Sequence, residues 1–373
     1  MRAQYVMVGG FLGAGKTTAI LRAAEHFARA GKRVGLIMND QSDSLVDTAL
    51  ARSREYPVEE IAGGCFCCRF NSLVDAAARL DSLTRPDVFL AEPVGSCTDL
   101  SATVAVPLGH LYGDRYAISP LSVLVDPERA LRVLGIESGR SFSPKVQYIY
   151  GKQLEEADVL VINKIDAVAA ARVAALRTAL VDRYPAARIV EISARSGGGV
   201  AEWIDSVVDA SGSGRVLDID YDAYAEGEAL LGWLNCTARL EGGEVDGDEL
   251  LLAIAARVHA DLAADGLELA HLKLTLVPSD VQGIAVVNAV RTSAPPELAF
   301  ALDATVDTGE ITLNLRAEAD PGRLETAVRA AVNTEAAARG IALSIQHLEC
   351  FRPGRPVPTH RMRSGQVVSG PIV

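Results

Sequence analysis

The stretch QYVMVGGFLGAGKTT, residues 4–18, decides the fold of the N-terminal half of the chain. An apolar run leads into the pattern G-x-x-x-x-G-K-T at Gly10–Thr17, and a helical pattern, TTAILRAAEHFARAG, follows at 17–31. A strand, a glycine loop and a helix in this order form a phosphate-binding loop, because backbone amides and the helix N-terminus surround the phosphate oxygens. A glycine-rich turn that fits by chance is the alternative, and the flanking strand and helix argue against it.

The loop predicts a role for each of its residues. Lys16 can reach the β- and γ-phosphates of a nucleotide, and the hydroxyl of Thr17 can ligate Mg²⁺. The other positions would contact the nucleotide within the loop: Gly10, Gly13, Ala14, Gly15 and Thr18. We therefore expect a nucleoside triphosphate with Mg²⁺.

A second motif indicates which base is bound. NKID, Asn163–Asp166, follows an apolar strand pattern and lies about 150 residues after the loop. The Asp166 carboxylate can accept both neighbouring donors of guanine, which adenine cannot offer, while the stem of Lys164 packs along the base. Ser193 and Ala194 follow the next strand and can present a backbone N–H to the guanine O6. The sequence therefore favours GTP over ATP.

The rest of the N-terminal half repeats the alternation of strand and helix. Apolar strand patterns alternating with helices predict a mostly parallel sheet with helices on both faces. We expect this P-loop GTPase domain at 1–212. The expected strands are 4–10, 33–39, 87–93, 121–127, 158–164 and 188–193.

A different pattern follows a Gly-, Ser- and Asp-rich segment at 213–228, which we interpret as a linker. Strand patterns in succession, flanked by helical patterns, predict a smaller α+β domain with an antiparallel sheet at 229–350. The expected strands are 230–240, 267–277, 283–292, 297–306, 310–318 and 341–351, and the expected helices are 247–265 and 321–339. Residues 351–373 form a proline-rich, extended tail.

Charge and hydropathy exclude several classes of partner. The formal net charge is −12, so we expect neither nucleic acid nor an anionic membrane as the main partner. The sequence shows no apolar run of 18 residues and no signal-peptide pattern at its start, which predicts a cytoplasmic protein. Thiols stay reduced in that compartment, so clustered cysteines favour metal or redox chemistry there.

Four motifs together resemble the CobW-like metal-chaperone GTPases, relatives of the urease and hydrogenase nickel-insertion GTPases. They are GGFLGAGKTT, EEIAGGCFCC, EPVGS and NKID, and they span roughly residues 1–210. The resemblance implies a SIMIBI-type fold, GTP hydrolysis and a metal bound at C-x-C-C. The tail sequence CFRPGRPVPTHRM also looks like the tails of some corrinoid-associated members.

The chain departs from the family pattern at two places. It has NDQSD at 39–43 where members commonly have N-E-F-G-E, and Glu92-Pro93-Val94-Gly95 where they have E-T-T-G or E-S-S-G. The carboxylates are kept. We predict that Asp40 activates the attacking water or helps to hold Mg²⁺, that Glu92 binds Mg²⁺ through water, and that Gly95 offers its N–H to the γ-phosphate.

Half of the six cysteines of the chain lie in one place, at Cys65, Cys67 and Cys68. Three thiolates suit Zn²⁺, and a closed structural zinc site would need a fourth ligand. Co²⁺ or Ni²⁺ comes next, and Co²⁺ is what the look of the tail and the family's link to cobalamin imply. We interpret the motif as an incomplete site with a position left for exchange. A buried structural cluster and a redox switch remain alternatives. Cys97 is either a fourth ligand or a core residue.

The sequence thus predicts a GTP-hydrolysing metallochaperone that delivers a transition metal to a client metalloprotein. We expect slow intrinsic turnover, with the site completed by the client or by a second copy in a homodimer. One alternative is a GTP-driven conformational chaperone that loads a cobalamin-type or other metallo-cofactor, with the thiols as redox sensors. Another is a small-molecule kinase, against which the NKID motif argues.

Overall fold

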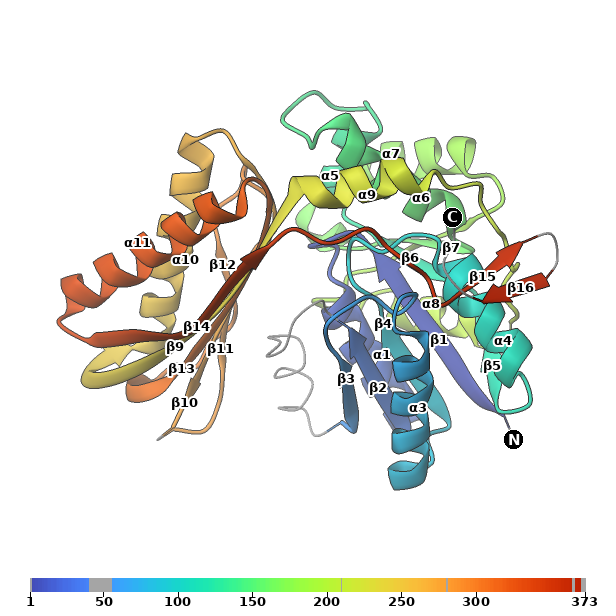
Figure 1. Cartoon of the computed structure of the whole chain (residues 1–373), viewed down its shortest axis with the longest axis horizontal. Helices are drawn as coiled ribbons and strands as arrows, with labels where there is room; N and C mark the ends of the chain where they lie inside the picture. Colours follow the sequence, from blue (N-terminus) through green and yellow to red (C-terminus); the bar gives the residue numbers. More distant parts are fainter. Residues whose placement is uncertain (1, 40–55, 209, 280, 364–365, 370–373) are drawn as a thin grey trace. The chain divides into compact units, whose positions relative to one another are not determined.

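The computed structural model describes residues 2–39, 56–208, 210–279, 281–363 and 366–369 of the 373-residue chain. These residues form two compact units (Figure 1). Described residues up to Ala225 belong to unit 1, those from Glu226 to Gly354 belong to unit 2, and from Arg355 onward the chain is again part of unit 1. The C-terminal segment therefore belongs to the same unit as the N-terminal phosphate loop.

Unit 1 is built on a parallel sheet with the strand order β3-β2-β4-β1-β6-β7-β8, and β5 also pairs with β1. Its central strands are buried along nearly their whole length, as expected where helices cover both faces. The predicted fold class is confirmed. The strands are β1 (Ala3–Gly10), β2 (Val34–Asn39), β3 (Val58–Ile61), β4 (Val88–Glu92), β5 (Tyr116–Ile118), β6 (Ser122–Val125), β7 (Val159–Ile162) and β8 (Arg188–Glu191).

The helices of unit 1 pack on this sheet. Helix α1 contacts β1, β2, β4 and α8, α3 contacts β2 and β3, and α6 contacts β1 (Figure 1). The helical segments are α1 (Lys16–Arg29), α3 (Phe70–Thr84), the π-helix η1 (Ser101–Ala105), α4 (Val106–Tyr112), α5 (Pro127–Val133), α6 (Pro144–Glu156), the 3₁₀-helix η2 (Ile165–Ala167), α7 (Ala170–Arg183), α8 (Val200–Val207) and α9 (Tyr221–Leu230), which reaches into unit 2.

Unit 2 is an antiparallel sheet with the strand order β12-β11-β10-β13-β9-β14, packed against two helices. Alternate residues of β9, among them Leu234, Cys236 and Leu240, join one apolar core with Ile254 and Val328 of the helices. Cys236 is therefore a core residue. The elements are β9 (Leu231–Asp246), α10 (Gly247–Ala264), β10 (Glu268–Pro278), β11 (Ala285–Ala289), β12 (Glu297–Phe300), β13 (Thr305–Glu318), α11 (Pro321–Arg339) and β14 (Ala342–Phe351).

The structure differs from the sequence prediction in several short elements. The prediction missed β3 and β5, which are four and three residues long and carry no distinct apolar run. The single strand expected at 297–306 is broken between β12 and β13, where Asp303 has a left-handed φ of 54°. The tail contains β15 (His360–Arg363) and β16 (Gln366–Ser369), which pair with each other. No helix in the part of the chain that the structure describes combines the length and the hydrophobicity needed to cross a membrane.

Candidate functional site: a phosphate loop and a thiol cluster

The phosphate loop connects β1 to α1 as the sequence predicts. Gly13 and Gly15 have φ angles of 78° and 91°, a region that side chains with a Cβ rarely adopt. A Cβ on Gly15 would lie 2.5 Å from the side-chain nitrogen of Asn163, so the loop has no room for one. Helix α1 begins at Lys16, directly after the loop, and its N-terminus therefore adds favourable electrostatics for an anion.

Polar side chains from two elements converge at the start of α1. The Thr17 hydroxyl donates to Glu92 Oε1 at 3.2 Å, and Lys16 Nζ lies 3.9 Å from the same oxygen. Glu92 ends β4, next to β1 in the sheet, so adjacent parallel strands bring it to the loop. All three side chains are buried, with 7% exposure for each residue. A hydroxyl and a carboxylate are oxygen ligands of the kind that Mg²⁺ prefers, and the donor set fits Mg²⁺ bound to a nucleotide.

The NKID motif at the end of β7 holds the phosphate loop from its other side. Asn163 donates to Ala14 O at 2.9 Å and accepts from the backbone N–H of Ala194 at 3.0 Å. Lys164 donates to Gly13 O at 2.6 Å. Asn163 therefore links its own strand end by hydrogen bonds to the phosphate loop and to the segment after β8. The motif alone did not indicate this structural role.

Lys164 also pairs with Asp126, at 2.6 Å between Nζ and Oδ2. Burial would raise the pKa of the Asp126 carboxyl, but the Lys164 ammonium outweighs it and lowers that pKa to about 2. Asp126, directly after β6, caps α5 by accepting from Arg129 N. Its ion pair with Lys164 was not predicted, because 38 residues separate them.

The residues predicted to bind the base lie close to Asn163 in the sequence or are hydrogen-bonded near it. Asp166 lies in η2 with an exposed side chain. The backbone N–H of Ser193 donates to Gly198 O at 2.8 Å, and that of Ala194 donates to Asn163, so both amides expected near guanine O6 are engaged within the protein. Asp40, predicted to be catalytic, lies outside the described residues.

The thiol cluster lies in the loop between β3 and α3. The sulfur of Cys65 is 2.8 Å from that of Cys67 and 3.0 Å from that of Cys68, and the latter two are 3.7 Å apart. Asn39, at the end of β2, donates to Ile61 O and Gly64 O and so fixes the start of this loop. The structure thus brings together the three cysteines in an arrangement that can hold one metal ion.

The thiols have unequal affinities for protons. Hydrogen bonds from Cys67 and Cys68, and then from Cys97, hold the pKa of Cys65 well below its usual value. The same contacts with Cys65 raise the pKa of Cys67, and they raise that of Cys68 to about 12. One thiolate is therefore favoured beside two thiols. Thiolates are the metal-binding form of cysteine, so the cluster is already partly prepared for a thiophilic ion.

The segment from Glu92 to Asp99 connects the nucleotide side to the thiol side. A Cβ on Gly95 would lie 3.0 Å from Lys16 Nζ, and the free thiol of Cys97 is hydrogen-bonded to Cys65. The buried amide of Gln153, on α6, donates to Gly95 O at 3.0 Å and to Cys97 O at 2.8 Å. Gln153 lies in an ordinary helical pattern 58 residues from Gly95, so nothing in the sequence indicates this role.

Residues 4–191, about half of the chain, match the family model described as "CobW/HypB/UreG, nucleotide-binding domain". The chain belongs to this family. The family match covers the phosphate loop, the thiol cluster and the NKID motif, so the predicted relationship is confirmed.

Curated relatives of this CobW/HypB/UreG member match part of the chain. The zinc chaperone CobW of Sinorhizobium sp is 28% identical over 192 residues, which are 46% of this chain and 53% of the relative. The zinc chaperone YeiR of Escherichia coli K12 is 31% identical over 43% of this chain and 46% of the relative. The zinc-regulated GTPase metalloprotein activator 1 of Schizosaccharomyces pombe is 23% identical over 62% of this chain and 54% of the relative. The chain thus spans about half the length of these relatives.

Proposed function

We propose that this protein is a GTPase that binds a transition metal at Cys65, Cys67 and Cys68 and delivers it to a client protein. Zinc is the first choice of ion, because thiolates suit it and because two relatives are named zinc chaperones. The client and the delivery step are part of the proposal.

The nucleotide part of the proposal is supported by the geometry of the loop. The glycines leave room for phosphate oxygens, and the ammonium of Lys16 can neutralise charge that develops on them during transfer to water. Thr17 and Glu92 would hold Mg²⁺, which supplies further charge stabilisation when it is bound. Asp166, exposed beside the loop, would accept the two donors of guanine. Asp40 is proposed to orient the attacking water.

The proposed metal binding is supported by the short distances between the three sulfurs and by the different pKa values of the three thiols. Three sulfurs lie within 3.7 Å of one another, and Cys65 favours the thiolate. Three ligands leave a tetrahedral ion with one open position, which suits exchange better than permanent storage. The ion is cargo in this reading, so the site must be able to release it.

One observation supports a link between nucleotide binding and metal binding. The segment from Glu92 to Asp99 provides a carboxylate to the Mg²⁺ side, a glycine against Lys16, and the Cys97 thiol that is hydrogen-bonded to Cys65. A change of the nucleotide that moves this segment would therefore also change the surroundings of the thiols. We propose that GTP and GDP states hold the ion with different affinity.

The test is zinc binding under reducing, anaerobic conditions, with a non-hydrolysable GTP analogue, with GDP and without nucleotide. We expect one Zn²⁺ per chain, an affinity that depends on the nucleotide, and loss of binding in Cys65→Ser. Cys350→Ser is the control, because this cysteine also carries a free thiol but belongs to unit 2. Equal zinc in wild type and Cys65→Ser, or one affinity in all three nucleotide states, would refute the proposal.

A further inference from the structure

The chain returns to unit 1 as an extended segment, residues 355–361, which we name the C-terminal strap. Pro356 and Pro358 are buried, whereas Val357 between them is 49% exposed. This alternation indicates an extended backbone with one side against the surface of unit 1. The strap ends in β15, which packs against η1 and α4.

The strap lies along the thiol loop and is hydrogen-bonded to it. The backbone N–H of Val357 donates to the sulfur of Cys68 at 3.4 Å. Thr359 donates from its backbone to Cys67 O at 2.8 Å and from its hydroxyl to Cys68 O at 3.1 Å. Cys65 and Cys67 are buried and Cys68 is half-buried, so the strap contacts the cysteine through which solvent reaches the cluster.

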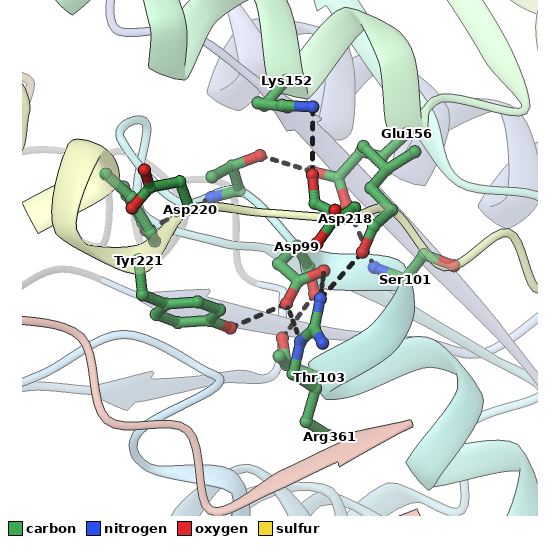
Figure 2. A network of polar contacts seen from close by, with 12 residues as sticks. Asp99, Ser101, Thr103, Lys152, Glu156, Asp218, Asp220, Tyr221 and Arg361 are labelled. Atoms are coloured by element: carbon green, nitrogen blue, oxygen red, sulfur yellow. Dashed lines mark hydrogen bonds and ion pairs between the residues drawn. The ribbon is translucent and has the colours of Figure 1, made fainter. Parts of the chain in front are cut away.

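A buried ion pair anchors the end of the strap. Arg361 Nε lies 2.6 Å from Asp99 Oδ2, and the exposed fractions of the two side chains are 11% and 1% (Figure 2). Arg361 also donates to Leu217 O at 2.8 Å. The hydroxyl of Tyr221, on the segment that leads to unit 2, donates to Asp99 at 2.7 Å. Asp99 therefore contacts both the strap and the segment that leads to unit 2.

Asp99 is also the last residue of the segment that begins at Glu92. The same short piece of chain thus contacts the phosphate loop, is hydrogen-bonded to Cys65 through Cys97, and anchors the strap. An N–H donor to a metal-bound sulfur stabilises the negative charge on that sulfur and fixes its orientation. A strap that supplies this donor and covers the half-buried cysteine has to leave before another protein can reach the ion.

We propose that the C-terminal strap completes the metal site and controls exchange of the ion, with Val357 N–H as a hydrogen-bond donor to Cys68 and with Arg361 and Asp99 as positioning residues. This inference rests on the proposed function, since it requires a thiophilic divalent ion at the cluster. The strap retains the ion while Asp99 holds Arg361, and it releases the ion when this pair opens.

The first experiment measures zinc release from the full-length, zinc-loaded protein to an excess of a chromogenic chelator. Arg361→Gln and Asp99→Asn are expected to release zinc about tenfold faster or more, because loss of one partner leaves the other charge buried and unpaired. Arg361→Lys should restore part of the retention. Arg355→Gln is the matched control, since Arg355 lies in the same strap but pairs with the exposed Asp222, and its release rate should equal that of wild type.

The second experiment isolates the hydrogen bond to sulfur. Val357→Pro removes the N–H, and the extended backbone next to Pro358 is compatible with proline at this place. Val357→Ala keeps the N–H and loses only an exposed side chain. With Co²⁺ as the probe, we expect Val357→Pro to shift the thiolate-to-cobalt charge-transfer band and to speed release, and we expect Val357→Ala to do neither.

The outcomes separate the strap from the function on which it rests. Wild-type release rates in Arg361→Gln, or a wild-type cobalt spectrum and release rate in Val357→Pro, would overturn the strap proposal while the metal site stands. Equal zinc in wild type and Cys65→Ser would instead overturn the metal site itself. Should Arg361→Gln fold poorly, Val357→Pro decides the question alone, because it changes no buried charge.

Discussion

Replacing Gly15 or Asn163 by alanine tests the tie between the phosphate loop and the NKID motif. In Gly15→Ala the new Cβ would lie 2.5 Å from Asn163 Nδ2, so the Asn163 side chain must move. That movement breaks its bonds to Ala14 O and Ala194 N, and Asn163→Ala removes the same two bonds. The two substitutions therefore disturb one contact by two routes.

The magnitudes follow from the geometry. The left-handed φ of 91° at Gly15 costs an alanine about 1 kcal/mol, and each buried backbone group left without a partner costs about 1 kcal/mol at the lower end of its range. Gly15→Ala should thus destabilise unit 1 by about 3 kcal/mol and Asn163→Ala by about 2 kcal/mol. The double variant should lose about 3 kcal/mol of stability, whereas two independent effects would add to about 5 kcal/mol. The coupling energy between the two substitutions is therefore expected to be about 2 kcal/mol.

The assay is urea unfolding of unit 1, followed through the emission of the buried Trp203. Trp233, in unit 2, is the other of the two tryptophans, so a Trp233→Phe background leaves one reporter. Gly31→Ala is the control, because Gly31 has a φ of 73° but nothing within 4 Å of an added Cβ, and it should cost only about 1 kcal/mol. Additivity of the two substitutions within about 0.5 kcal/mol would refute the shared contact.

Three further predictions concern the nucleotide and a buried acid. Asp166→Ala should weaken the affinity for GTP about tenfold or more and leave the affinity for ATP unchanged, as measured by competition binding. Equal losses of affinity for both nucleotides would contradict the assignment of guanine. Thr17→Ala should make nucleotide affinity insensitive to Mg²⁺ in a magnesium titration. Burial, and then Asp99, hold the pKa of Glu156 well above its usual value. The folded protein therefore keeps a proton on Glu156 that the unfolded chain loses above about pH 4. The stability of the fold consequently falls as pH rises through the folded pKa. Glu156→Gln should remove this slope in unfolding measured across pH.

The local parts of the fold and the site could be read from the sequence because they depend on neighbouring residues. The phosphate loop is a strand, a glycine turn and a helix within 28 residues, and the parallel sheet follows from long apolar runs between helical patterns. Glu92 could be expected near Thr17, since parallel strands end at the same edge of a sheet. Short strands such as β3 lack enough residues to show a period.

The contacts that join these parts could not be read in the same way. Arg361 and Asp99 are 262 residues apart, and Val357 and Cys68 are 289 apart. Nothing in the PTHR sequence distinguishes an arginine that ends in a buried pair from one in a solvated tail. The prediction of an extended, proline-rich tail described its backbone but not the surface on which it lies.

The burial of Asp99 gives the strongest reason to regard the segment from Glu92 to Asp99 as one functional element. Burying a carboxylate is costly, and here burial raises its pKa even though Arg361 and Tyr221 favour the ionised form. An apolar residue at this place would remove that cost, but it would also leave the guanidinium of Arg361 without its partner. The arrangement therefore adds little to stability, and what it provides is a specific attachment of the strap to the segment that bears Glu92. Gln153 also holds the middle of this segment through Gly95 O and Cys97 O, and we propose on this basis that a displacement at Glu92 moves the thiols and the strap together.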